Sequence, residues 1–171
     1  MRDFVSKRTA NAVTLINLVF GCLSLISTLD GKYTIAAIYI LASVVMDGLD
    51  GRIARRLGVI SDIGKELDSL CDLVSFGVAP AVLLYAQVLH SFPASLGLVA
   101  AVLYINCGAF RLARFNVLNI KDYFVGIPIT MAGGILALVS LGEAHLPPYL
   151  TLCTVLILAF LMISNLKVRK I

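Results

Sequence analysis

The chain has 171 residues, of which 60% are hydrophobic and only 14% are charged, and its mean hydropathy is +0.97. About a quarter of the residues of a typical soluble domain are charged, so this composition excludes an ordinary soluble fold. The formal net charge of +4 suits anionic lipid headgroups and the sorting of charges across a membrane, and it requires no nucleic-acid partner.

Six apolar segments follow one another along the chain, separated by short polar stretches. Each contains, or reaches by extending into its flanks, the roughly 20 residues that a helix needs to cross a hydrocarbon core. The segments are 10–29, 33–46, 73–89, 94–110, 126–142 and 147–166. The sequence therefore predicts an all-α integral membrane protein with six transmembrane helices, in which residues 1–171 form a single domain.

The basic residues indicate how these segments are oriented. Of the 14 Lys and Arg residues, all but Lys32 lie before the first segment, after the last, or in the second and fourth connections. Positively charged residues concentrate on the cytoplasmic side of membrane proteins. We therefore expect both termini and the polar stretch 47–72 to be cytoplasmic, with the active site facing the cytoplasm from the cell membrane.

Regularly spaced aspartates follow the second apolar segment. If its helix continues at about 100° per residue, Asp47 and Asp50 lie on one face. Gly51, Ala54 and Arg55 fall within the same arc of roughly 140°.

A second helix, after a short loop, repeats this pattern. Ser61, Gly64, Asp68 and Asp72 share one of its faces. If the two helices are antiparallel neighbours, all four aspartates of the two faces can meet.

Four facing carboxylates repel one another by several kcal/mol unless a cation lies between them. Carboxylate oxygens suit Mg²⁺ or Mn²⁺, which keep coordination positions for a substrate phosphate. The helix lengths put the carboxylates near the cytoplasmic headgroups, where Arg55 offers a fork to phosphate. Three alternatives remain: ordinary interfacial charges, a noncatalytic scaffold, and a cation-coupled transporter, whose carboxylates would lie nearer the midplane.

The aspartate array resembles a known signature. Asp47-x-x-Asp50-Gly51-x-x-Ala54-Arg55, eight residues, then Gly64-x-x-x-Asp68-x-x-x-Asp72 is similar to the motif of the CDP-alcohol phosphotransferases at every defining position. The resemblance implies two divalent ions, Mg²⁺ or Mn²⁺, held by the four aspartates, with Asp72 also the general base. It further implies that the CDP-lipid contacts Gly51, Ala54, Arg55, Ser61 and Gly64.

The first segment resembles the same family in the stretch "ANAVTLIN", residues 10–17. It keeps Asn11, Thr14 and Asn17, which the resemblance puts near the nucleotide, but has Ala10 where the family has proline. The alternative for these three residues is helix capping and hydrogen bonding between helices.

The stretches "GAFRLARFNV" (108–117) and "YFVGIPITMAG" (123–133) resemble the serine-using branch of the family, which usually has a proline at the position of Thr130. Arg111 and Arg114 are expected to hold the serine carboxylate or lipid phosphates; alternatively, they are interfacial residues that snorkel.

The reaction implied is transfer of a phosphatidyl or archaetidyl group from CDP-diacylglycerol or CDP-archaeol to the hydroxyl of L-serine, releasing CMP, in phospholipid biosynthesis. Glycerol 3-phosphate and inositol phosphate are the alternative acceptors. The resemblance also leads us to expect a homodimer.

Overall fold

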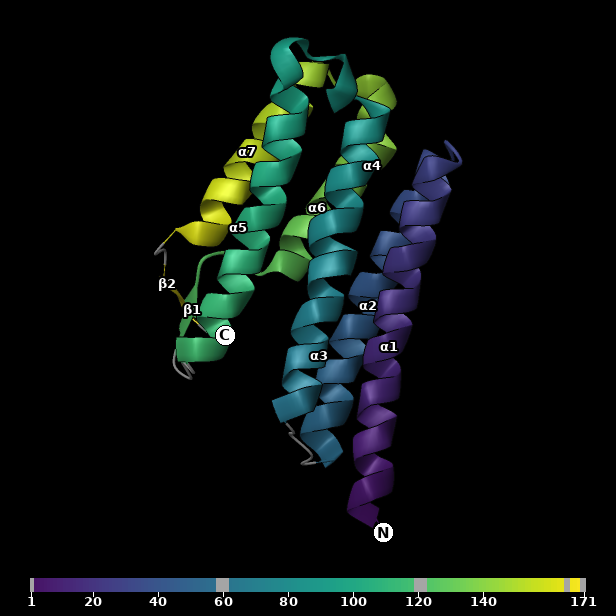
Figure 1. Ribbon diagram of the computed structural model, residues 1–171, viewed down its shortest axis with the longest axis vertical. Helices are drawn as coiled ribbons and strands as arrows, with labels where there is room; N and C mark the ends of the chain where they lie inside the picture. The colour runs from purple at the N-terminus through teal and green to yellow at the C-terminus, as the bar shows by residue number, and fades with distance from the viewer. Residues whose placement is uncertain (1, 58–61, 119–122, 165–166, 170–171) are drawn as a thin grey trace.

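The computed structural model describes residues 2–57, 62–118, 123–164 and 167–169, and the side chains of 14–49, 63–117, 126–143 and 145–164. The chain is a bundle of long helices that lie roughly along one direction (Figure 1). In chain order the elements are α1 (Arg2–Leu29), α2 (Tyr33–Leu57), α3 (Asp62–Asp72), the π-helix η1 (Leu73–Val78), α4 (Ala79–Gln87), the 3₁₀ turns η2 (Leu89–Ser91) and η3 (Pro93–Ser95), α5 (Leu96–Leu118), β1 (Tyr123–Val125), α6 (Ile129–Gly142), the 3₁₀ turn η4 (Glu143–His145), α7 (Pro148–Ile163) and β2 (Lys167–Arg169).

In the part of the chain that the structure describes, six helical passes alternate in direction along the bundle. The elements α3, η1 and α4 form one continuous pass, because Asp72 and Ala79 at the two ends of η1 keep helical backbone angles. The other passes are α1, α2, α5, α6 and α7. The start of α1 and the end of α7 both point toward the lower end of the bundle in Figure 1, the end at which α2 is followed by α3.

The predicted helical class is confirmed, with one addition. The strands β1 and β2 pair antiparallel, with Tyr123 opposite Arg169 and Val125 opposite Lys167. They join the segment after α5 to the segment after α7, and no alternation of apolar and polar residues in the sequence predicted them.

A glycine closes the turn between the first two helices. The amide of Gly31 donates to the carbonyl of Thr28 at 3.0 Å, and the amide of Lys32 donates to that of Ser27 at 2.8 Å. These are the two hydrogen bonds of a Schellman motif, which needs a left-handed residue after the helix. Gly31 supplies it with φ = 72°. The turn lets α1 and α2 pack against each other along their lengths.

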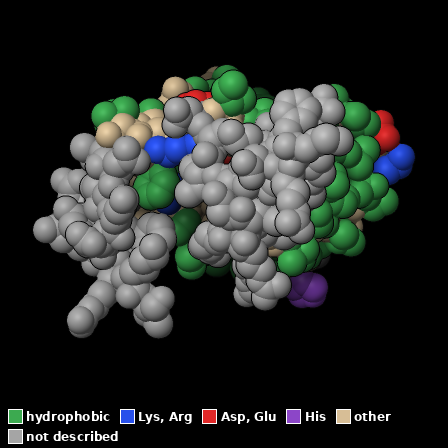
Figure 2. Space-filling view, turned by 90° about the horizontal axis from the view of Figure 1, so that it is seen from below, with side chains coloured by type: hydrophobic (Ala, Val, Ile, Leu, Met, Phe, Trp, Pro, Cys, Tyr) green, Lys and Arg blue, Asp and Glu red, His purple; other side chains and the backbone are tan. Residues whose placement is uncertain are grey.

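Two helical passes, Ile63–Gln87 and Pro93–Val117, are each 25 residues long and apolar enough to cross a membrane. The other described helices contain shorter apolar stretches of 10 to 17 residues. Large apolar side chains such as Phe160 and Ile157 are exposed on the outside of the bundle. Hydrophobic side chains also make up much of the described surface that is visible from below (Figure 2). Such a surface suits contact with lipid chains.

Several helix boundaries differ from the apolar segments in the sequence. The helical pass that contains the third segment begins at Asp62, eleven residues before that segment, and α5 runs on to Leu118. The fifth pass begins at Ile129 instead of residue 126. Gly126 has φ = 75° and lies against the end of α7, where an added Cβ would approach the Met162 carbonyl oxygen to 2.5 Å.

Candidate active site

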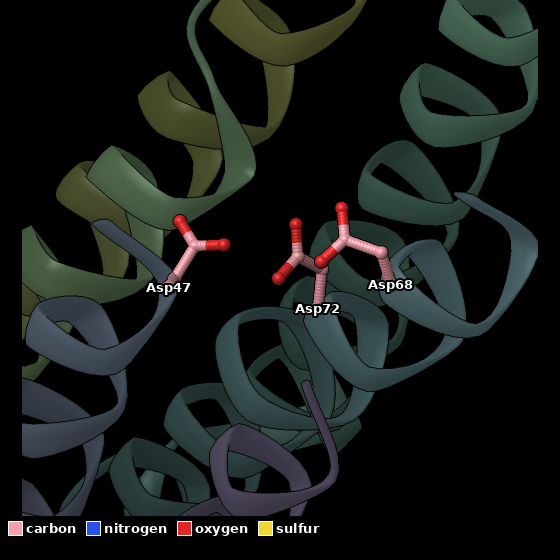
Figure 3. Close-up of side chains that lie close together, drawn as sticks. All are labelled: Asp47, Asp68 and Asp72. Atoms are coloured by element: carbon pink, nitrogen blue, oxygen red, sulfur yellow. The ribbon is translucent and has the colours of Figure 1, made fainter. Parts of the chain in front are cut away.

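Three aspartates from α2 and α3 converge on one another. Asp47 comes from α2, whereas Asp68 and Asp72 are one turn apart on α3. One carboxylate oxygen of each lies within 4.8 Å of the others, and the three side chains point toward one another (Figure 3). The helical phasing of the sequence thus correctly brought Asp47, Asp68 and Asp72 together.

The remaining predicted residues on these helices are only partly described. Asp50, Gly51, Ala54 and Arg55 lie on α2, one to two turns beyond Asp47, but their side chains lie outside the described residues. The same holds for Asn11 on α1, and Ser61 lies outside the described chain altogether. Gly64 lies on α3, partly buried, one turn before Asp68.

The three carboxylates differ in their surroundings. Asp72 is buried, with 8% of its surface exposed, whereas Asp47 and Asp68 are half-buried. Three negative charges this close together, one of them buried, require compensation. A divalent cation suits the donor set, because all its ligand atoms are carboxylate oxygens, the type that Mg²⁺ and Mn²⁺ prefer. The described residues therefore fit a metal centre.

Asn17 connects Asp72 to two other helices. Its Nδ2 donates to Asp72 Oδ1 at 3.2 Å, and its Oδ1 accepts a hydrogen bond from the Ser43 hydroxyl of α2. Its backbone carbonyl accepts from Ser75 Oγ at 3.1 Å. Asn17 is 1% exposed, so its amide is enclosed among protein groups. Thr14, one turn earlier on α1, is also buried.

The π-helix η1 begins immediately after Asp72. A π-turn is rare, occurs often at functional sites, and leaves backbone carbonyls that need other donors. Tyr104 of α5, fully buried, supplies one such donor, with its hydroxyl 3.0 Å from the Phe76 carbonyl. Gly21 and Gly133 let α1 and α6 approach η1, since a Cβ on them would lie 2.5 Å from Ser75 Oγ and 2.8 Å from Phe76 Cα. The segment after Asp72 is thus held from three sides.

Asp47 has a partner from a distant part of the chain. Thr130, in the first turn of α6, donates from Oγ1 to Asp47 Oδ2 at 3.2 Å. In the sequence, Thr130 stood out only because the serine-using branch of the family usually has a proline at this position. A proline there could not have made this hydrogen bond, because it has no hydroxyl.

The two predicted arginines have different environments. Arg111 is 7% exposed and lies close enough to Asp72 for their charges to interact. Its Nε has no hydrogen-bond partner within the described part of the chain, and its guanidinium carbon lies 6.0 Å from the centre of the Phe115 ring. Arg114 instead donates to the Ile163 carbonyl at 3.2 Å and to the Ser164 carbonyl at 3.5 Å, at the end of α7.

A second polar cluster links α3 to the end of α5. Asn116 Nδ2 donates to Ser69 Oγ at 3.0 Å and to Glu66 Oε1 at 3.3 Å, and Lys65 Nζ donates to the Asn116 carbonyl at 3.2 Å. These bonds tie α3 to the end of α5. They help to fix the rotation of α3 that directs Asp68 and Asp72 toward Asp47.

Comparison with known proteins identifies the class to which this helical bundle and its acidic centre belong. The family model of the CDP-alcohol phosphatidyltransferases matches residues 7–170. The chain therefore belongs to the CDP-alcohol phosphatidyltransferase family, as the aspartate motif had indicated.

Within that family, the chain is similar to proteins that share one name, CDP-diacylglycerol–serine O-phosphatidyltransferase. It is 40% identical to the protein of Methanocaldococcus jannaschii over 158 residues, which are 92% of this chain and 72% of the relative. It is 38% identical to that of Bacillus subtilis over 156 residues, covering 91% of this chain and 86% of the relative. It is 35% identical to that of Helicobacter pylori over 166 residues, covering 92% and 70%.

Proposed function

We propose that this protein transfers a phosphatidyl group from CDP-diacylglycerol to L-serine and releases CMP. The observation that carries the proposal is the convergence of Asp47, Asp68 and Asp72 in a chain that is similar over nine-tenths of its length to enzymes named for this reaction. The serine hydroxyl oxygen attacks the phosphorus on the lipid side of the diphosphate. The bond from that phosphorus to the bridging oxygen breaks, and CMP leaves with the oxygen.

Asp47, Asp50, Asp68 and Asp72 would hold two divalent ions, Mg²⁺ or Mn²⁺. Such ions, when bound, neutralise the diphosphate and stabilise the charge that develops on the leaving oxygen. The support for this is the all-oxygen donor set contributed by two helices. The protein's part is to hold these carboxylates at fixed positions before the substrate arrives.

Asp72 would accept the proton of the serine hydroxyl as the new bond to phosphorus forms. A carboxylate is a weak base, but the hydroxyl becomes strongly acidic only as that bond forms, so the position of the base matters more than its basicity. The position of Asp72 is well defined, because its Oδ1 accepts a hydrogen bond from Asn17 Nδ2 and the π-helix η1 follows it.

The nucleotide would bind on the side of the aspartates toward the end of α2. Gly51, Ala54, Arg55, Ser61 and Gly64 match the family motif, and Asn11 and Thr14 lie on the adjoining helix α1. Small residues leave room for the ligand, and the Arg55 guanidinium can bind a phosphate with two parallel hydrogen bonds.

Arg111 is the better candidate for the serine carboxylate. It is buried beside Asp72, and its Nε has no partner among the described groups, whereas the Arg114 guanidinium binds the last carbonyls of α7. A buried arginine that faces the reacting centre gains a charge-assisted hydrogen bond when a carboxylate enters. Arg114 is then a structural link between α5 and α7.

We also propose that the chain forms one domain that spans the membrane six times, with both termini and the aspartates on the cytoplasmic side. The even number of alternating helical passes and the one-sided distribution of Lys and Arg support this topology. CDP-archaeol would serve as well as CDP-diacylglycerol, because the two share the diphosphate headgroup on which these residues act. The homodimer remains a prediction.

The test is CMP release by the purified protein with CDP-diacylglycerol, Mg²⁺ or Mn²⁺, and a panel of acceptors. We expect L-serine to be used at least tenfold more efficiently than glycerol 3-phosphate or inositol phosphate, about 1.4 kcal/mol in transition-state stabilisation. A preference for glycerol 3-phosphate would contradict the serine assignment alone. Full activity in EDTA would contradict the metal-dependent mechanism.

A further inference from the structure

Thr130 reaches the acidic centre from a helix that contributes none of the motif residues. It lies in the first turn of α6, and its hydroxyl donates to Asp47 Oδ2, 83 residues away in the chain. The start of α6 is firmly packed: the preceding residue, Ile129, is 1% exposed. Its Cδ1 lies 2.7 Å from where a Cβ on Gly108 would be and 3.5 Å from that of Gly77. The hydroxyl is therefore presented to Asp47 from a rigid position.

Asn17 makes the equivalent contact with Asp72. An ionised carboxylate only accepts hydrogen bonds, so the side of the Asn17 amide that faces Asp72 is Nδ2. The Ser43 hydroxyl donates to the other end of the same amide and thereby fixes its orientation. Both the nitrogen and the oxygen of the Asn17 amide are thus hydrogen-bonded to other protein groups.

From these two contacts we infer that Thr130 and Asn17 are positioning residues, which fix the carboxylates of Asp47 and Asp72 in the orientation that binds the divalent cation. The inference rests on the proposed metal-dependent function. Both donors are neutral, so they restrict rotation of the carboxylates without cancelling their charge. Donors of this kind, one step removed from a metal, commonly change affinity or activity 10- to 100-fold when they are removed.

Repulsion between the aspartates explains why such hydrogen-bond donors are needed. Without a cation, carboxylates whose oxygens lie within 4.8 Å of one another are driven to rotate apart. A hydrogen bond from α6 on Asp47 and another from α1 on Asp72 oppose that rotation. The centre is then already arranged when the cation arrives, and little ordering remains to weaken its binding.

The Thr130 test compares Thr130→Val, which has the same shape without the hydroxyl, with Thr130→Ser, which keeps the hydroxyl. Binding of Mn²⁺ to EDTA-washed protein is measured by calorimetry, together with the apparent Tm, kcat, and the KM values for serine and CDP-diacylglycerol. The control is Thr154→Val on α7, where the hydroxyl bonds only to the Leu150 carbonyl of its own helix.

We expect Thr130→Val to bind Mn²⁺ about tenfold more weakly and to lose about tenfold in kcat, with both KM values within twofold of the wild type. Thr130→Ser should recover most of both losses, and Thr154→Val should leave both quantities unchanged. A Thr130→Val protein that is folded and binds Mn²⁺ as the wild type does would overturn the role of Thr130. So would a serine variant that resembles the valine variant.

The Asn17 test uses Asn17→Ala, with Asn106→Ala as the control, because Asn106 donates to the Val102 carbonyl on the outer face of α5. Weaker Mn²⁺ binding and lower kcat at an unchanged KM for CDP-diacylglycerol would support positioning. A raised KM for CDP-diacylglycerol at unchanged Mn²⁺ affinity would instead make Asn17 a nucleotide contact and overturn the inference.

If Asn17→Ala does not fold, Ser43→Ala provides the second measurement. It removes only the hydroxyl that fixes the Asn17 amide, and we expect about threefold weaker Mn²⁺ binding; no change would overturn the role of Asn17. The wild type separates this inference from the proposed function. A wild type that neither binds Mn²⁺ nor releases CMP contradicts the proposed function itself, whereas an active wild type with unaffected variants contradicts only the positioning roles.

Discussion

Neutralising one aspartate of the acidic centre should make the metal-free protein more stable while abolishing its function. Asp68→Asn keeps the size of the side chain and removes one charge of the three. At a separation of 4.8 Å, two unit charges repel by about 3.5 kcal/mol at an effective dielectric constant of about 20, and by about 1 kcal/mol in bulk water. Because Asp68 is half-buried and faces two other carboxylates, we expect a gain of about 1–3 kcal/mol in the free energy of unfolding.

The assay is thermal unfolding in detergent, with EDTA and then with excess Mn²⁺. For a chain of this size, each kcal/mol corresponds to roughly 2–4 °C in Tm, so metal-free Asp68→Asn should melt several degrees above the wild type. The order should reverse in Mn²⁺ at about 1,000 times its Kd, because the ion then stabilises the wild type by about 4.1 kcal/mol, more than the variant gains without metal, and the variant should lose this stabilisation.

The matched control is Glu66→Gln, on the same helix but on its outer face, where the carboxylate accepts from Asn116. It should show neither the gain in EDTA nor the loss in Mn²⁺. A metal-free Asp68→Asn protein that is less stable than the wild type, or one stabilised by Mn²⁺ as much as the wild type is, would refute the reasoning that the three carboxylates form a cation site.

Four further predictions concern the base, the arginines, the topology and the pH dependence. Asp72→Asn should lose turnover yet still bind CDP-diacylglycerol in a thermal-shift assay; near-normal turnover would assign the base to another group. Arg111→Met should raise the KM for serine more than that for CDP-diacylglycerol, whereas Arg114→Met should lower the Tm with little change in either KM. In a cysteine-free background, Lys32→Cys should react with a membrane-impermeant thiol reagent from outside the cell and Gly58→Cys only from the cytoplasmic side. The reverse pattern would place the aspartates on the extracytoplasmic side of the membrane. Burial raises the pKa of Glu143, and the hydrogen bond from Thr151 only partly opposes this shift, so the folded chain binds that proton more tightly than the unfolded chain does. Stability should therefore fall as the pH rises through the range just above the ordinary glutamate pKa of about 4.3, and Glu143→Gln should remove this component of the pH dependence of unfolding.

Chain composition and helical periodicity were enough to predict the helical bundle and the core of its site. Apolar segments of helix-spanning length predicted the passes, and the spacings that join Asp47 to Asp50 and Asp68 to Asp72 predicted the two acidic faces. Both inferences use local rules, 1.5 Å of rise and 100° of rotation per residue, which depend little on the rest of the molecule.

Some backbone features had no local signal. The π-helix Leu73–Val78 follows Asp72 within a stretch that the sequence predicted as part of an ordinary helix, and its Phe76 carbonyl accepts a hydrogen bond from Tyr104, 28 residues later. The pairing of Tyr123–Val125 with Lys167–Arg169 likewise depends on two segments that meet only when α5 and α7 pack together. Such features arise from long-range contacts, which overrule local preference.

The sequence by itself determined the class of protein, the membrane-suited composition and the aspartates that meet. Only the tertiary structure decided which neighbours support them: Thr130 on Asp47, Asn17 on Asp72, and Arg111 in place of Arg114 beside the acidic centre. The physical reason is that helical phasing fixes which side chains share one face of one helix. The rotation and depth at which separate helices pack then fix which side chains from different helices come within hydrogen-bonding distance, and that packing depends on the whole chain.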